Sequence, residues 1–195
     1  MALTAVTAPA VEPVSLTEAK LHLRVDVTED DTLIATLIQA AREMVEGISR
    51  RALITQVWKL ILDEFPAGDT ISIPMPPLQA VASITYKDQD GSASTFSSDD
   101  YIVNSDCEPG KVALAYGSSW PSTTLYPTGA VTVQFTAGFG DASTDVPEKY
   151  RQALLLLCGH FYENREAIAT TGAVPKEVPF GVEALLWLDR NMGFP

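Results

Sequence analysis

The chain has 195 residues, of which 46 % are hydrophobic, so it is long enough for one or two compact domains with a buried core. Its formal net charge of −12 and its lack of any cluster of Lys and Arg argue against a protein that wraps nucleic acid by neutralising phosphates. Two cysteines, Cys107 and Cys158, are too few for a disulfide framework and are typical of a reducing compartment.

Residues 1–14 are rich in apolar side chains but have no basic segment and no continuous apolar core. We therefore interpret them as an extended N-terminal arm and not as a signal peptide. No apolar run approaches the roughly 20 residues needed to span a bilayer. These features lead us to expect a protein that is made in the cytoplasm and has no membrane partner.

Two helices are predicted after the arm. Ser15 and Glu18 have the spacing of a capping box, which predicts a helix over residues 16–24. Thr28 is a candidate N-cap for a second helix, because acidic residues and then a run of apolar residues at helical spacing follow it. These apolar residues are Leu33, Ile34, Leu37, Ile38, Ala41, Val45 and Ile48.

From residue 56 the pattern changes to short segments that are rich in β-branched and aromatic residues and are separated by Pro, Gly, Asp and Ser. The segments are QVWKLILDEF, TISIP, VASITYK, YIVN, KVALAY and VTVQFTA. They predict an antiparallel β-domain of about six strands. The sequence DQDG resembles part of a calcium loop, but Tyr86 and Ser97 stand where an EF-hand needs carboxylates, so we interpret it as a hairpin turn that leads to ASTF.

The last long helix is predicted from residue 148 to residue 166, with Pro147 suited to its first turn. Within it, His160 and Glu163 lie one turn apart, as two ligands of a zinc site would. An HExxH site needs a second histidine at position 164, which is Asn, and the chain's other histidine is His22. We therefore interpret this stretch as a polar helix surface in a contact between subunits, formed by His160, Tyr162, Glu163, Arg165 and Glu166.

No catalytic constellation stands out elsewhere. Cys158 and His160 are two residues apart on a helix and so do not face each other. The sequence AGFGD has no third glycine and no helix directly after it, which favours a turn over a phosphate-binding loop. We expect no catalytic residue, no cofactor and no bound metal.

The C-terminal segment, residues 172–195, begins with a linker that contains two prolines and continues with a short apolar element. An apolar element of this kind must bury its face somewhere. It can fold back on its own protein, or it can dock in a groove of a partner or a neighbouring subunit, with Trp187 and Phe180 as anchors. The candidate docking residues are Phe180, Val182, Leu185, Leu186, Trp187 and Arg190.

Taken together, these segments resemble the head–tail connector (adaptor) proteins of tailed phages, in particular the longer members with a β-insertion. The resemblance rests first on the stretch SLTEAKLHLRVDVTEDD and on a helix that ends in AREMVEGIS. It continues through the β segments and QALLLLCGHFYENREA to PFGVEALLWLDRN, where Leu188 and Asp189 replace the family's usual Pro-Tyr. It covers nearly the whole chain.

The resemblance implies a structural protein that forms a ring of about twelve copies under the portal of a capsid. The implied partners are the portal protein, the next neck or tail (head-closure) protein, further copies of the chain, and double-stranded DNA that passes through the ring. The C-terminal arm would reach the portal. We therefore expect localisation at the head–tail junction of a virion and no enzymatic activity.

The predicted fold class is α+β. We expect a helical core over residues 15–55 and 146–171, an inserted antiparallel β-domain over residues 56–145, and terminal arms over residues 1–14 and 172–195. Two other functions remain open at this point. One is a different neck or head-completion protein of the same virion, and the other is a small hydrolase that uses His22 or His160 as its base.

Overall fold

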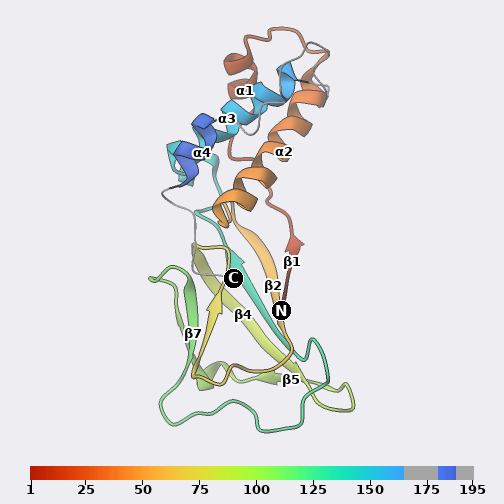
Figure 1. Cartoon of the computed structure of the whole chain (residues 1–195), viewed down its shortest axis with the longest axis vertical. Helices are drawn as coiled ribbons and strands as arrows, with labels where there is room; N and C mark the ends of the chain where they lie inside the picture. Colours follow the sequence, from red (N-terminus) through yellow and green to blue (C-terminus); the bar gives the residue numbers. More distant parts are fainter. Residues whose placement is uncertain (165–179, 188–195) are drawn as a thin grey trace. The chain divides into compact units, whose positions relative to one another are not determined.

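The structure is a computed structural model that describes residues 1–164 and 180–187 (Figure 1). The described residues form two compact units. Residues 1–9 and 55–139 form a β unit, and residues 10–54, 140–164 and 180–187 form a helical unit. Helices and antiparallel sheets therefore occur together, which confirms the predicted α+β class.

The helical unit begins with α1 (Leu16–Leu23), which has the predicted capping box. The Oγ atom of Ser15 accepts a hydrogen bond from the backbone N–H of Glu18 at 3.2 Å, and the Glu18 carboxylate accepts one from the backbone N–H of Ser15 at 2.9 Å. These two bonds satisfy N–H groups that the first turn of a helix leaves without partners. The helix ends at Arg24, which has a left-handed backbone conformation.

Helix α2 (Asp31–Ser49) begins two residues later than predicted, because Asp30, and not Thr28, occupies the N-cap position. The carbonyl oxygen of Thr28 instead accepts a hydrogen bond from the N–H of Asp31 at 3.2 Å, so Thr28 belongs to the preceding turn. The predicted apolar face is confirmed in its central stripe: Ile34, Ile38, Ala41 and Val45 are all buried.

Helix α3 (Glu148–Glu163) packs against α1 and α2, and a short helix α4 (Phe180–Trp187) packs against α2 and α3. The buried residues of α3 are Tyr150, Ala153, Leu154, Leu157 and Cys158. Pro147 is the N-cap of α3, and a short 3-10 helix, η2 (Ser143–Asp145), precedes it. The structure ends α3 at Glu163, before the expected residue 166, and the residues after Asn164 lie outside the described part until residue 180.

In the described residues the β unit contains eight strands, where about six were expected, and these form two antiparallel sheets. The five-stranded sheet has the order β1 (Ala2–Thr7), β2 (Gln56–Leu62), β8 (Val131–Ala137), β4 (Leu78–Lys87) and β5 (Ala93–Phe96). The three-stranded sheet has the order β3 (Thr70–Ile73), β7 (Gly110–Leu114) and β6 (Tyr101–Asn104). A 3-10 helix, η1 (Ser98–Asp100), lies between β5 and β6.

The register of the larger sheet explains its core. Leu60 and Ile84 both pair with Val133 of the central strand β8, and all three side chains are fully buried. Alternate residues of β8 are buried, as expected for a strand whose one face packs on a core. The predicted hairpin is also confirmed, because β4 pairs with β5 and the side chain of Asp88 accepts hydrogen bonds from the backbone N–H groups of Asp90 and Ser92 in the turn.

The N-terminal segment, expected as an extended arm, is extended over Ala2–Thr7 but pairs there with β2 as strand β1. All six of its residues are exposed. Strand β1 therefore forms one edge of the five-stranded sheet, and β5 forms the other.

Candidate interaction surfaces

Helix α4 carries most of the residues that were predicted to contact a portal. Val182 and Leu186, one turn apart, are fully buried within the helical unit, and a Cβ atom placed on Gly181 would lie 3.8 Å from Leu156 of α3. Leu185 is half-buried, whereas Trp187 is 66 % exposed. One side of α4 is thus used inside its own unit, and Trp187 is available to a partner.

For two further residues of the predicted docking segment, Phe180 and Arg190, the structure does not describe the side chain. Phe180 is the first residue of α4, but its side chain lies outside the described part, and Arg190 lies outside it altogether. Docking of the C-terminal segment on a portal stays a prediction.

The end of α3 holds the residues that were predicted to form a contact between subunits. His160 is half-buried, and its carbonyl oxygen accepts a hydrogen bond from the side-chain amide of Asn164 at 2.8 Å, which helps to close the end of the helix. The Tyr162 hydroxyl donates a hydrogen bond to the carboxylate of Asp30, and Glu163 is exposed. Arg165 and Glu166 lie outside the described residues, so this subunit contact also stays a prediction.

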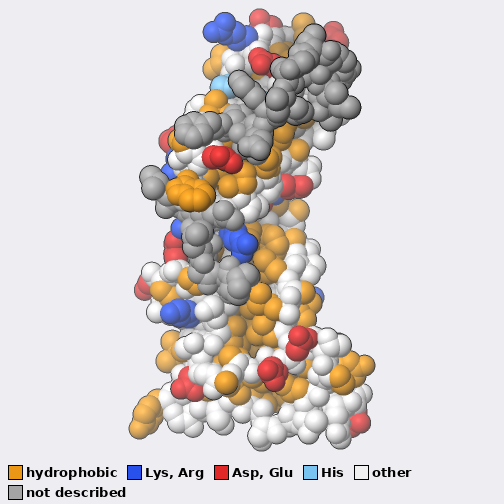
Figure 2. Space-filling view, in the orientation of Figure 1, with side chains coloured by type: hydrophobic (Ala, Val, Ile, Leu, Met, Phe, Trp, Pro, Cys, Tyr) orange, Lys and Arg blue, Asp and Glu red, His pale blue; other side chains and the backbone are white. Residues whose placement is uncertain are grey.

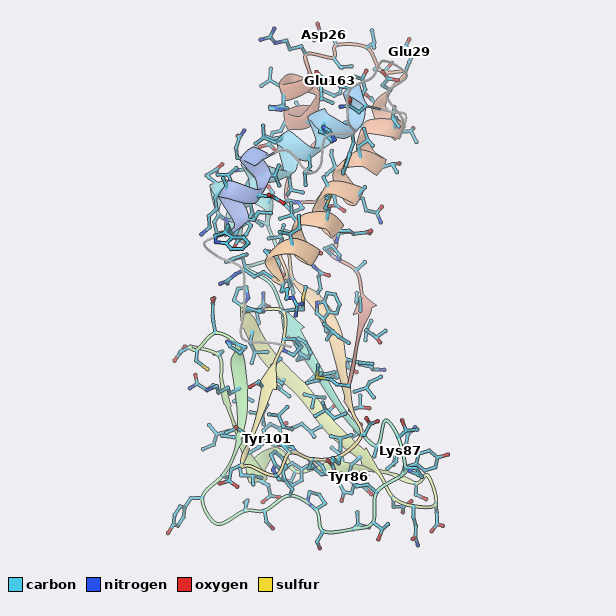
Figure 3. The ribbon with its side chains drawn as sticks, viewed as in Figure 1. Asp26, Glu29, Tyr86, Lys87, Tyr101 and Glu163 are labelled. Carbon is cyan, nitrogen blue, oxygen red and sulfur yellow. The ribbon has the colours of Figure 1, made fainter. Side chains whose placement is uncertain are left out.

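The described side chains at this end of the helical unit include several acidic groups. Figure 3 shows Glu163 at the same end of the helical unit as Asp26 and Glu29 of the α1–α2 connection. Within the described residues, however, no group of three or more His, Cys, Asp or Glu side chains is arranged to hold a metal ion. The His22 ring lies 3.6 Å from the position that a Cβ atom on Gly159 would occupy, which is an ordinary contact distance between α1 and α3.

A buried ion network joins α2 to the segments on either side of it. The Nε atom of Arg42 lies 2.8 Å from Glu12, and its terminal nitrogen lies 3.0 Å from Glu46. Glu46 also accepts a hydrogen bond from the backbone N–H of Leu53 at 2.9 Å. Burial disfavours the charged form of Arg42, but attraction to Glu46 and Glu12 outweighs this effect and raises the pKa of Arg42. These contacts give the network a structural role, because they link α2 to Glu12 before it and to Leu53 after it.

A second ion network connects α1 with α3. Arg151 pairs with Glu18 of α1 and with Glu148 of its own helix, and its Nε atom donates a hydrogen bond to the carbonyl oxygen of Pro13 at 3.2 Å. The hydrogen bonds from Ser15, together with Arg151, hold the pKa of Glu18 below its ordinary value. This network fixes the start of α1 on α3.

An open groove of about 600 Å³ lies within the helical unit. Its lining is mostly apolar, and the carboxylates of Glu12 and Asp141 are the ionisable side chains in it. The lining residues are Val11, Glu12, Val14, Ser15, Leu16, Ala35, Ile38, Asp141, Ala142 and Ser143. The hydroxyls of Ser15 and Ser143 are further polar groups in this lining, which contains no histidine, cysteine or lysine.

Comparisons with known proteins give the family. Residues 13–109 match the family model of the phage gp6-like head-tail connector protein. A chain from the neck of an empty GTA particle, computed with C6 symmetry, is similar over 100 % of this chain and 98 % of that chain, with 28 % identity and a TM-score of 0.80. The chain belongs to the phage head–tail connector proteins.

Two further solved structures resemble this connector. They are the virion of a native gene transfer agent (GTA) particle and the neck of a native GTA particle computed with C12 symmetry, each with 28 % identity and a TM-score of 0.79. Both matches cover 100 % of the connector and 98 % of the other chain. A search of curated proteins finds no match. In the described residues of the connector, no helix is both long and apolar enough to cross a membrane.

Sequence reasoning missed several exposed apolar residues of the connector. Leu21, in the last turn of α1, is 80 % exposed, and Val27, in the connection between α1 and α2, is also exposed. A signal for Leu21 was present, because it lies two residues after Ala19, the buried residue of α1, and residues at that spacing point to different sides of a helix. No comparable signal was available for Val27, because the turn that contains it has no regular period.

Proposed function

We propose that this connector is a subunit of an oligomeric ring at the head–tail junction of a virion. In this ring it would join the portal to the next neck or tail protein and surround the DNA that passes between head and tail. The observation that carries the proposal is the similarity over the whole chain, at 28 % identity, to a chain from the neck of a GTA particle. The C6 and C12 symmetries of the neck structures support a cyclic assembly, for which we propose twelve copies.

The chemistry of the chain supports a structural role. A connector needs surfaces for partners and has no need of a reacting group, and this chain belongs to a family of structural connectors. The described residues offer exposed apolar side chains, such as Trp187 and Leu21, and ion networks whose members hold elements together. We therefore propose that the connector is not an enzyme.

We propose that the C-terminal segment, which includes α4, forms the contact with the portal. A partly exposed tryptophan next to two buried aliphatic residues is a suitable anchor, because tryptophan contributes a large apolar area with few rotatable bonds. Trp187 has this position in α4. In this arrangement Val182 and Leu186 would hold the helix on its own unit while Trp187 enters a pocket of the portal.

The test is binding of the purified connector to its purified portal ring. The full-length chain is compared with a chain that ends at Thr171, and the mass of each free protein is measured in parallel. We expect the full-length chain to bind and the shortened chain to lose most of its binding. If neither chain binds and the connector remains a monomer on its own and on the portal, the proposed position at the portal is wrong.

A further inference from the structure

The connection between β7 and β8, residues 115–130, is a long loop without regular structure at the end of the five-stranded sheet. Its sequence, AYGSSWPSTTLYPTGA, has no Asp, Glu, Lys or Arg, although 19 % of the chain is charged. Loops longer than about 12–15 residues inside a compact unit are uncommon and often functional. The loop also lies outside residues 13–109, so the family match does not account for it.

The first half of the loop is anchored by an aromatic cluster. The Trp120 ring stacks on Phe65 at 5.0 Å with an angle of 12° between the planes, and it lies 5.4 Å from Phe96. The indole N–H of Trp120 donates a hydrogen bond to the carbonyl oxygen of Gly68 at 2.9 Å. Figure 3 shows Tyr86 and Tyr101, which contact Phe65 and Phe96, at this end of the β unit. These contacts hold the loop in one conformation.

The second half of the loop is held by hydrogen bonds. The carboxylate of Asp63 accepts one from the backbone N–H of Gly129 at 2.8 Å and one from the Thr128 hydroxyl at 3.1 Å. The backbone N–H of Tyr126 donates to the carbonyl oxygen of Lys87 at 3.1 Å. Because both halves are fixed, the loop loses little further conformational entropy when it binds a partner.

Tyr116 occupies the corner of a tight turn in this fixed loop. The N–H of Ser118 donates a hydrogen bond to the carbonyl oxygen of Ala115 at 3.0 Å, and Gly117 has a φ of +82°, which fits a type II turn with Tyr116 at its second position. The Ser118 hydroxyl fixes the turn further by a hydrogen bond to Asp100 at 2.9 Å. The Tyr116 side chain is fully exposed, at 107 % of its reference area. It therefore makes no contribution to the fold that would explain its presence.

The chemistry of the loop selects the kind of partner. The loop has no Lys or Arg with which to neutralise phosphates, so its composition favours a protein over a nucleic acid as its ligand. Tyrosine together with Ser, Thr and Gly is typical of loops that bind proteins, since tyrosine gives a large contact area with few rotatable bonds and hydroxyls adapt their hydrogen bonds. Figure 2 shows mostly hydrophobic and uncharged polar atoms around β5 at this end of the β unit, with a few acidic side chains.

The position of the loop favours a different protein over a second copy of the connector. The loop joins the sheet at Val131, beside the end of β2 at Leu62, whereas the chain enters and leaves the unit at the other end, next to Gln56 and Ala137. Copies in a ring lie side by side, and the sides of this sheet are its edge strands β1 and β5. A copy paired edge to edge would therefore meet β1 or β5, whereas this loop lies at the end of the sheet.

We propose that residues 115–130 form a preorganised protein-binding loop whose anchor is Tyr116, and that its partner is an uncharged, apolar surface of a different component of the particle. The inference rests on the proposed function, since it deepens the contact with the next neck or tail protein. Tyr116 inserts its ring into a pocket of that partner, and the hydroxyls of the surrounding Ser and Thr residues bond to backbone groups at the rim.

The first test places a photoreactive phenylalanine derivative at position 116 of the full-length chain in assembled particles. The same group at Asp90, in the exposed turn between β4 and β5, is the matched control. After irradiation, mass spectrometry identifies the adduct. We expect an adduct with a different particle protein from position 116, at least several-fold stronger than from position 90. An adduct with a second connector copy, or no adduct in particles that contain the connector, would overturn the inference.

The second test compares Tyr116→Ala with Tyr116→Phe. Because the side chain is fully exposed, we expect both free proteins to keep the melting temperature of the natural chain. Loss of a central aromatic anchor should reduce the yield of particles with joined heads and tails by about tenfold for Tyr116→Ala, while Tyr116→Phe keeps most of it. An unchanged yield for Tyr116→Ala contradicts the inference, whereas absence of the natural chain from particles counts against the proposed function itself.

Discussion

At the scale of single residues, the pair of Arg42 and Glu46 raises the question of what a buried charge does in a structural protein. In the part of the chain that the structure describes, the buried charged residues are Arg42 and Glu46. A buried ion pair contributes little net stability, because removing both charges from water offsets most of their attraction. Here the pair has a second effect, since Arg42 holds Glu12 and Glu46 holds the N–H of Leu53. The network thereby holds the segment before α1, through Glu12, and the segment after α2, through Leu53, against α2.

The first prediction concerns removal of one partner from this pair. Arg42→Met keeps the apolar stem of the side chain but removes the cation that lies 3.0 Å from the buried Glu46 carboxylate. We expect the free energy of unfolding to fall by about 3–5 kcal/mol, because removing one partner of a buried ion pair is costly. Urea unfolding of the full-length chain, followed by circular dichroism, measures this change.

Glu43→Gln is the control for Arg42→Met. Glu43 lies 3.8 Å from Arg42 but its side chain is 61 % exposed, so we expect a change of less than about 1 kcal/mol. A loss of stability for Arg42→Met as small as that of the control would show that Glu46 finds other compensation. In that case the network would not determine the path of the chain around α2.

At the scale of secondary-structure elements, α4 combines two alternatives that the sequence left open. The apolar C-terminal element could fold back on its own protein or dock on a partner. The structure buries Val182 and Leu186 and exposes Trp187, so the same short helix has an inner side and an outer residue. Folding back on the helical unit is therefore observed for residues 180–187, and docking through Trp187 remains compatible with it.

The second prediction separates these two roles of α4. Leu186→Ala removes a fully buried side chain and should lower the free energy of unfolding by about 2–5 kcal/mol. Trp187→Ala removes an exposed side chain, so we expect little change in stability but at least a tenfold weaker binding to the portal ring. Urea unfolding and titration of the portal ring measure the two effects. Equal portal binding by Trp187→Ala and the natural chain would remove Trp187 from the interface.

Most of the helices and strands could be predicted from the sequence. The capping box located α1, the helical spacing of apolar residues located α2, and short segments rich in β-branched and aromatic residues located most strands. The start of α2 was misplaced, since Thr28 and Asp30 are both good N-caps and the choice depends on the turn before them. The pairing of Ala2–Thr7 with β2 was missed, because all residues of this edge strand are exposed and show no alternation.

The candidate interaction residues were less predictable than the fold. Composition identified the apolar C-terminal element, but which of its residues are buried follows from packing on α3, which a single sequence does not specify. The exposure of Tyr116 could not be foreseen either. Its loop is fixed by contacts of Trp120 with Phe65 and of Gly129 with Asp63, and these partners are more than fifty residues away in the chain.

At the scale of the whole molecule, the net charge of −12 bears on the passage of DNA through a ring. Twelve copies would carry twelve times this charge around a polymer that is itself strongly negative. At physiological ionic strength the Debye length is about 8 Å, so repulsion acts on DNA only close to the surface of the ring. In the proposed ring, such a surface would keep the DNA away from the wall without holding it at a fixed place.

The third prediction is that the connector does not bind DNA, although we propose that it surrounds DNA. Fluorescence anisotropy with a labelled duplex, at about 150 mM salt, should give no binding at micromolar concentrations of the full-length chain, because no cluster of Lys and Arg is present to release counterions. Lower salt should not produce binding, since weaker screening strengthens the repulsion. A chain in which several exposed acids are replaced by Lys is the control that shows the assay can detect binding. Tight binding by the natural chain would mean that local basic contacts outweigh the net charge, and the connector would then have to hold the DNA and release it during transfer.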